Sequence, residues 1–167
     1  MSTRGTFSVV VTKEDIVFAA AHFLTLPGHR CERLHGHNYR AGVVVEGALD
    51  SQSGFVFDFV ALKALMRRLT EELDHRVLLP TQNPALAVAR TGDRVTVSYD
   101  GAERYAFPAG DCVLLPIGNT TAELLAQHLA QRVRDALARE TTVHLHALEL
   151  EVEESFGQAA RYREVFD

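Results

Sequence analysis

Four side chains that can bind a metal or move a proton lie close together in the stretch CERLHGHNYR. Cys31 and Glu32 come first, and His35 and His37 follow, two residues apart. Residues two apart in a strand point to the same side, so both imidazoles can face one ion. A catalytic zinc ion typically uses three protein ligands and keeps one position open. His22 is the best third ligand, because a strand–loop–strand fold-back brings the end of the preceding apolar segment close.

The other histidines make a weaker case. His144 and His146 form a second pair two residues apart, but no third ligand or cysteine lies nearby. Such pairs are common in unrelated strands, so we interpret these two as ordinary strand residues. We place His29 and His128 in loop or surface positions.

Cys31 lies within the polar run HRCER, which is unlike a buried core segment. The alternative is a small buried hydrophobic residue, the commonest fate of a free cysteine. A nearby cation and histidines favour the thiolate, which acts as a base or nucleophile. Asp74 precedes His75 at the end of an expected helix, and a carboxylate that orients an imidazole prepares it for proton transfer. Adjacent side chains rarely reach that geometry, so this dipeptide alone carries little weight.

These residues must be positioned by the surrounding elements. The pattern predicts strands over 6–12, 15–24, 37–49, 144–155 and 158–166, helices over 60–73 and 119–140, and a hairpin over 93–107. Strands and helices do not alternate regularly. The sequence therefore predicts an α+β fold with an antiparallel sheet.

The first helix has apolar residues at Leu62, Leu65, Met66 and Leu69, which are the i, i+3, i+4 and i+7 positions of one face. Asp58 can cap its amino end.

The second helix begins at a predicted capping box of Thr120 and Glu123. The hairpin turns at Asp100 and Gly101, a dipeptide suited to positive φ angles. Cys112 follows the hairpin, and we expect it to be a buried strand residue.

Length and composition set the class of protein. The chain has 167 residues, 47% hydrophobic and 23% charged, which is typical of one folded domain. A net charge of -5 gives no general affinity for nucleic acid or anionic membranes, and no apolar run approaches the roughly 20 residues of a membrane span. Two cysteines are too few for a disulfide scaffold, and we see no signal peptide. We therefore expect a cytoplasmic protein.

Six motifs occur in one order: FAAAH (18–22), CERLHGHNY (31–39), GFVFDFVALK (54–63), LDH (73–75), NTTAELLA (119–126) and VEES (152–155). This order resembles the 6-pyruvoyl-tetrahydropterin and 6-carboxy-tetrahydropterin synthase family. The resemblance implies one tunnelling-fold domain over residues 1–167, with an antiparallel four-stranded sheet and two helices on one face. It also implies a homohexamer built as a dimer of trimers, with sites between subunits. The departure from the family is an insertion at about 81–116, which we expect to form a β-hairpin.

The resemblance also implies residue roles. It assigns zinc to His22, His35 and His37, catalysis to Cys31, Asp74 and His75, and pterin binding to Glu154 and Thr121. Glu154 is preferred over Glu153 because it lies eight residues before Tyr162, as in the family's last motif.

The implied substrate is 7,8-dihydroneopterin triphosphate, and the implied chemistry is that of a lyase. Zinc would polarise the side-chain diol, a thiolate would remove a proton, and a buried carboxylate would hold the pterin ring. Cations for the triphosphate are left open among Arg30, Arg33, Arg40 and Lys63.

The spacing of Cys31 before HGH resembles the 6-carboxy enzymes of deazapurine (queuosine) biosynthesis. Three alternatives stay open: a 6-pyruvoyl synthase, a folate-branch aldolase in which Glu32 takes the cysteine's place, and a non-catalytic pterin-binding homologue. An unrelated zinc hydrolase would give no reason for the Glu154 motif.

Overall fold

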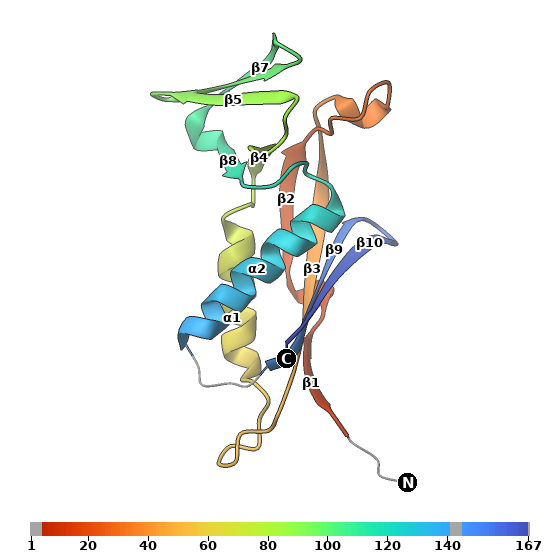
Figure 1. Cartoon of the computed structure of the whole chain (residues 1–167), viewed down its shortest axis with the longest axis vertical. Helices are drawn as coiled ribbons and strands as arrows, with labels where there is room; N and C mark the ends of the chain where they lie inside the picture. The colour runs from red at the N-terminus through yellow and green to blue at the C-terminus, as the bar shows by residue number, and fades with distance from the viewer. Residues whose placement is uncertain (1–4, 141–144, 167) are drawn as a thin grey trace.

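The structure is a computed structural model that describes residues 5–140 and 145–166. Its strands and helices, in chain order, are β1 (Phe7–Val11), β2 (Val17–His22), β3 (His35–Gly47), α1 (Phe59–Glu71), β4 (Arg76–Pro80), β5 (Leu86–Thr91), β6 (Arg94–Tyr99), β7 (Ala102–Pro108), β8 (Cys112–Leu115), α2 (Ala122–Glu140), β9 (Leu145–Ser155) and β10 (Gln158–Val165). Figure 1 shows an elongated molecule in which α1 and α2 lie alongside the long strands. The layer of β5 and β7 stands apart at one end.

The long strand β3 is the centre of the main sheet, whose order is β10-β9-β3-β2-β4-β8. One edge of β3 pairs with β9 over residues 40–47. The other edge pairs first with β2 and then with β1, both antiparallel. A 3₁₀ helix at Lys13–Asp15 separates these two strands, which is how both come to share one edge.

The predicted four-stranded antiparallel sheet is too small. Among the described residues the main sheet has seven strands: β1, β2, β3, β9 and β10 form antiparallel pairs, β4 pairs parallel with β2, and β8 pairs parallel with β4. The fold is therefore α+β with a larger, mixed sheet. The added strands are short apolar runs, RVLLP and CVLL, which flank the insertion. Strands in parallel pairs are often apolar throughout, so they lack the alternation that reveals an antiparallel strand.

Helix α1 confirms the sequence pattern. The Asp58 carboxylate accepts a hydrogen bond of 2.8 Å from the Val60 N–H and caps the helix. The predicted apolar face, which includes Leu62 and Met66, is buried in the main core. Because that core also holds side chains from the strands and from α2, the two helices are fixed relative to the sheet.

The amino end of α2 differs from the predicted capping box. The Leu124 N–H points to the Thr121 hydroxyl, at 3.4 Å, so the cap is one residue later than expected. Thr120 is fully buried instead, and its hydroxyl donates to the Phe23 carbonyl oxygen at 3.1 Å. Sequence alone does not separate two adjacent threonines, because either hydroxyl can cap a helix.

The insertion forms a three-stranded antiparallel sheet of β5, β6 and β7. The predicted hairpin is confirmed as β6 and β7, and Asp100 and Gly101 have positive φ angles of 49° and 83°. Strand β5 is an addition to the prediction. Cys112 begins β8 and is half-buried rather than fully buried.

A second, smaller core joins this inserted sheet to the main sheet. It consists of Phe23, Leu79, Val95 and Val97, which are all nearly inaccessible to solvent. Phe23 follows directly on β2, Leu79 lies on β4, and the two valines lie on β6. The inserted sheet is therefore anchored beside the end of the strand that carries His22.

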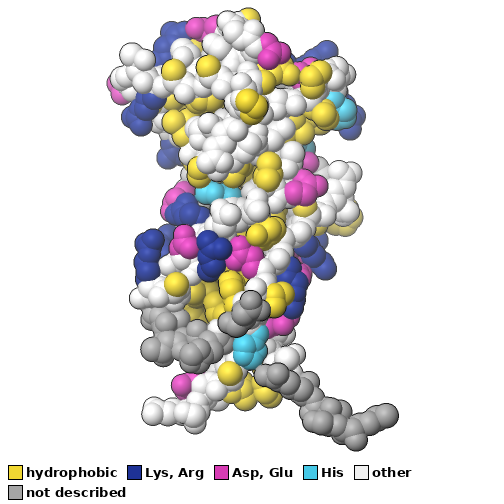
Figure 2. Space-filling model, in the orientation of Figure 1, with side chains coloured by type: hydrophobic (Ala, Val, Ile, Leu, Met, Phe, Trp, Pro, Cys, Tyr) yellow, Lys and Arg dark blue, Asp and Glu magenta, His cyan; other side chains and the backbone are white. Residues whose placement is uncertain are grey.

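The described surface carries both charges. On the face seen in Figure 2, Lys and Arg side chains lie interspersed with Asp and Glu side chains. Pairs such as Arg132 with Glu72 and Arg134 with Glu164 connect α2 to its neighbours. Among the described helices, none is both long and apolar enough to cross a membrane.

Candidate metal centre

Three histidines meet where β2 and β3 pair. The ladder places His22 opposite His35 and Ala20 opposite His37. His35 and His37 share the β3 face that buries Tyr39, and this face packs against the helices. One nitrogen from each ring lies within 4.8 Å of the others. The predicted fold-back has therefore brought His22 to the pair.

Hydrogen bonds set the tautomer of two of these rings. The Nδ1 of His22 lies 2.9 Å from the Thr120 carbonyl oxygen, and the Nδ1 of His35 lies 2.7 Å from the Arg33 carbonyl oxygen. A carbonyl oxygen only accepts, so each Nδ1 carries the proton. Each Nε2 is left with a lone pair, which is the form that ligates a metal.

The third ring has a hydroxyl partner, which can donate or accept: the Nδ1 of His37 lies 3.3 Å from the Ser155 hydroxyl. Its Nε2 faces the Glu154 carboxylate, as does the Nε2 of His22, at 3.8 and 3.3 Å. Burial lowers the pKa of His22 to about 4, and burial is also the main reason that the pKa of His37 is lowered. Both rings are therefore neutral near pH 7.

The Nε2 of His22 is a buried nitrogen without a hydrogen bond among the described residues. The contact to Glu154 does not satisfy it, since this Nε2 has no proton to donate. A buried lone pair beside a carboxylate and two more imidazoles suits a bound cation. Nitrogen-rich, three-histidine chemistry fits zinc and similar divalent ions.

Strand alternation separates the two adjacent glutamates of β9. The Glu154 carboxylate lies on the histidine side, where it accepts a 3.4 Å hydrogen bond from the Tyr39 hydroxyl. Burial and this carboxylate raise the pKa of Tyr39, so the hydroxyl stays protonated. Glu153 lies on the opposite side of the sheet, paired with Lys13 and Arg40.

Glu154 and Thr121 also line one pocket of about 290 Å³, together with Leu24, Glu123 and Gln158. The two residues expected to bind the pterin are thus brought together, although they are 33 positions apart. The pocket borders the metal centre through Glu154. It offers a carboxylate and a hydroxyl for hydrogen bonds to a polar ring.

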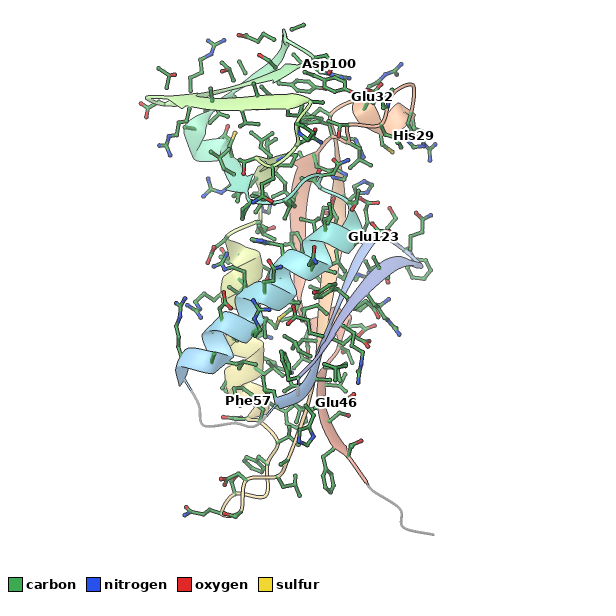
Figure 3. The ribbon with its side chains drawn as sticks, viewed as in Figure 1. His29, Glu32, Glu46, Phe57, Asp100 and Glu123 are labelled. Atoms are coloured by element: carbon green, nitrogen blue, oxygen red, sulfur yellow. The ribbon has the colours of Figure 1, made fainter. Side chains whose placement is uncertain are left out.

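The loop before β3 carries Cys31 and Glu32 in a 3₁₀ helix, Arg30–Glu32. The Cys31 carbonyl oxygen accepts a 2.8 Å hydrogen bond from the Leu24 N–H, which fastens the loop beside the end of β2. Cys31 is half-buried and unpaired as a thiol. The Glu32 carboxylate accepts a 3.1 Å hydrogen bond from the Gly28 N–H. Figure 3 shows Glu32 at the same end of the molecule as Asp100 of the inserted sheet.

Asp74 and His75 do form a hydrogen-bonded pair, with 2.8 Å between Oδ2 and Nδ1. The other Asp74 oxygen accepts 2.7 Å from the Ala19 N–H, and this bond is the main reason that the pKa of Asp74 is lowered. His75 has a φ of 55°, unusual for a residue other than glycine, and its side chain is 83% exposed. This unusual backbone angle accompanies the Asp74–His75 hydrogen bond, which adjacent side chains rarely form.

The pair makes no direct contact with the rest of the site. Among the described residues, no hydrogen bond or ion pair links Asp74 or His75 to Cys31 or to the three histidines. His75 does share a pocket of about 500 Å³ with His37, and Arg76, Asp111 and the edge of β2 also line this pocket. Cys31 is not among the residues that line it.

The remaining predictions had mixed outcomes. His29 lies in the exposed loop, as expected, whereas His128 is 93% buried within α2, so a surface position was wrong. His146 is an exposed residue of β9, and His144 lies outside the described residues. Sequence reasoning took Thr120 for a helix cap and gave Tyr39 no role, so it missed the contacts of both residues with the site. Their neighbours in sequence, GNTTA and GHNYR, are polar and gave no sign that either residue is buried.

Among the candidate triphosphate cations, two already have carboxylate partners. Lys63 lies 2.8 Å from Asp15, and Arg40 faces Glu153. Arg30 and Arg33 are exposed on the loop that carries Cys31.

Known proteins resemble this chain along most of its length. A sequence model of the 6-pyruvoyl tetrahydropterin synthase family matches residues 11–165. A Methanocaldococcus jannaschii protein provisionally named 6-carboxy-5,6,7,8-tetrahydropterin synthase is 32% identical over 151 residues, which cover 90% of this chain and 91% of that protein. A dihydroneopterin monophosphate aldolase of Pyrococcus furiosus is 43% identical over 61 residues, 36% of this chain and 50% of that protein.

Solved structures agree with this relationship. The 6-pyruvoyltetrahydropterin synthase of Plasmodium vivax superposes with a TM-score of 0.86 at 29% identity, covering 98% of this chain and 100% of that one. A variant of the same enzyme, in which alanine replaces a glutamate described as a catalytic residue, also gives 0.86, at 28% identity and the same coverage. The chain therefore belongs to the 6-pyruvoyl tetrahydropterin synthase family.

Proposed function

We propose that this chain is a zinc-dependent lyase that converts 7,8-dihydroneopterin triphosphate and water into 6-carboxy-5,6,7,8-tetrahydropterin, acetaldehyde and triphosphate. The observation that carries the proposal is the cluster of His22, His35 and His37, two of which face Glu154 at the border of the Thr121 pocket. The tetrahydropterin synthase names of the relatives support the same reaction class.

Different residues of the chain bind the pterin, hold the metal and remove the proton. Glu154 accepts hydrogen bonds from the amino-pyrimidinone edge of the pterin, and Thr121, which lines the same pocket, also holds the ring. His22, His35 and His37 would hold the zinc ion, which would supply a Lewis acid for the diol oxygens of the substrate. Cys31, as the thiolate, removes the proton from the adjacent carbon.

The second proton transfer belongs to His75, which Asp74 orients. Because this imidazole is exposed and separate from Cys31 within one chain, we propose that it serves the site of a neighbouring copy. A homohexamer, built as a dimer of trimers, would bring the two halves together. We place the enzyme in the cytoplasm, where a free thiol stays reduced, and in deazapurine (queuosine) biosynthesis.

A second candidate is the aldolase or 6-pyruvoyl branch, with Glu32 as the base. Two observations favour it: the aldolase from Pyrococcus furiosus shares 43% identity over 61 residues, and a glutamate is described as catalytic in the Plasmodium vivax enzyme. Against it, the Glu32 carboxylate already accepts a hydrogen bond from Gly28.

Mass spectrometry of the products from 7,8-dihydroneopterin triphosphate tests the proposal. Zinc-loaded protein should release acetaldehyde and the 6-carboxy product. Cys31→Ala should abolish this, while Glu32→Gln and the matched cysteine variant Cys112→Ser should keep it. A 6-pyruvoyl product would move the chain to the other synthase. Turnover that survives Cys31→Ala but not Glu32→Gln would assign the aldolase-type branch. Zinc and pterin binding without turnover would indicate a binding protein.

A further inference from the structure

The inserted sheet contacts the loop that leads into the metal centre through Arg104 and Tyr105, and we call these contacts the grip. The Arg104 guanidinium donates a 2.9 Å hydrogen bond to the Glu32 carbonyl oxygen. The Tyr105 hydroxyl accepts 3.2 Å from the Leu34 N–H and lies 3.5 Å from the same Glu32 oxygen. Both gripping residues belong to β7, more than 70 positions away in sequence.

The gripped segment lies directly between two residues of the proposed site. Cys31 precedes it and His35 follows it. Its middle residue, Arg33, supplies the carbonyl oxygen that holds the His35 Nδ1. The position of this short segment therefore sets both the place of the thiol and the orientation of a metal ligand.

The grip is itself braced. The Arg104 guanidinium lies 5.5 Å from the ring centre of Tyr99 and 5.6 Å from that of Tyr105. The Tyr105 ring packs on Phe23 at 5.1 Å, beside His22. Cation–π and aromatic contacts of this kind restrict a long side chain to one geometry.

The grip also occupies Glu32. One of its carboxylate oxygens accepts the Gly28 N–H, and the other lies 3.8 Å from Arg104. The 3.8 Å contact with Arg104 places this carboxylate against the inserted sheet. By contrast, the Cys31 thiol makes no hydrogen bond among the described residues.

We propose that Arg104 and Tyr105 are positioning residues, and that the inserted sheet holds Glu32 in a structural role so that Cys31 is the proton-transfer group of this loop. This inference rests on the proposed function, and it names Cys31 rather than the adjacent Glu32 as the residue that removes the proton. Neither Arg104 nor Tyr105 is assigned a contact with substrate.

Arg104→Gln and Tyr105→Phe test the proposal, with Arg94→Gln as the matched control. Arg94 lies on the same inserted sheet, is 65% exposed and faces only Glu103 among the described carboxylates. Two quantities are measured on zinc-loaded protein: kcat and KM for 7,8-dihydroneopterin triphosphate, and the rate at which iodoacetamide alkylates Cys31, followed by peptide mass spectrometry. Cys112 is the internal reference for alkylation.

We expect Arg104→Gln to lower kcat by about 10- to 100-fold with KM nearly unchanged, the size typical of losing an outer support of a site. The rate of Cys31 alkylation should change by at least about threefold, while the rate of Cys112 alkylation should stay the same. Tyr105→Phe should act in the same direction with a smaller effect and an intact fold. Arg94→Gln should match the wild-type protein.

Other outcomes overturn the proposal. A raised KM with kcat unchanged would make Arg104 a substrate ligand. An equal loss of kcat in Arg94→Gln would show that the substitutions act by destabilising the inserted sheet in general. If the wild-type protein shows no turnover, the proposed function fails separately. The alkylation comparison then still decides, because a Cys31 rate that is unchanged in both variants contradicts the grip.

Discussion

His22 and Thr120 meet across the main fold, where the Nδ1–H of a strand residue donates 2.9 Å to a carbonyl oxygen just before α2. The Thr120 hydroxyl lies 3.2 Å from the same nitrogen and donates to Phe23. The start of a helix thus fixes the tautomer of a candidate metal ligand 98 positions earlier.

Thr120→Val should weaken zinc binding by about 10- to 100-fold, because the hydroxyl helps to orient His22. It should also cost about 1–3 kcal/mol of unfolding free energy, since buried partners lose a hydrogen bond. Competition with a chelator measures the first quantity and urea denaturation the second. Thr70→Val, at another buried threonine in α1, should lose stability only. Equal zinc affinity in the two variants would contradict the role of Thr120.

The adjacent glutamates Glu153 and Glu154 of β9 should have different functions. Glu154→Gln is expected to reduce kcat/KM by at least about 100-fold, because a neutral amide binds the pterin edge more weakly than a carboxylate. Glu153→Gln should leave turnover intact and lower stability by about 1–3 kcal/mol, because it weakens the pairs with Lys13 and Arg40. Steady-state kinetics and denaturation measure these effects. If Glu153→Gln lost turnover and Glu154→Gln lost only stability, the assignment of Glu154 to the histidine side would be wrong.

Mixing of inactive variants tests whether sites form between copies. Cys31→Ala and His75→Ala should each be inactive, since each lacks one proton-transfer group. Unfolding the two together and refolding them should restore part of the activity, because some sites then receive an intact Cys31 and an intact His75 from different chains. Refolding each variant alone is the control. No recovery in mixed oligomers of confirmed composition would place the complete site within one chain.

Asp74 predicts a pH dependence of stability. The Ala19 N–H lowers its pKa in the folded state below the ordinary value of 3.8. Its contribution is therefore fully present above the unfolded pKa and is lost as pH falls through the folded pKa. The difference in unfolding free energy between wild type and Asp74→Asn should be largest near neutral pH and shrink below about pH 4. A constant difference from pH 7 to pH 3 would contradict this.

Much of the metal centre was predictable from local rules. Period-two alternation put His35 and His37 on one face, and the fold-back brought His22 opposite His35. The same alternation separates Glu154 from Glu153 once the buried face is known. These inferences needed only residues that are near in sequence or fixed by a strand's geometry.

Contacts between distant segments were not predictable. The parallel pairing of β4 and β8 leaves no alternating pattern, and nothing local places Arg104 against Glu32. The His75 contact accompanies a left-handed backbone angle, which has a low prior for any residue other than glycine. His128 is a polar residue on a helix face that tertiary packing buries.

The division into two cores has a consequence for heat tolerance. The inserted sheet is held by the small core around Phe23 and Leu79, whereas the three histidines rest on the main core. Elements with few buried apolar contacts open locally at a lower free energy than the whole domain. On warming, the grip on the Cys31 loop should therefore loosen before the sheet melts, so catalysis would cease at a temperature at which most of the protein is still folded.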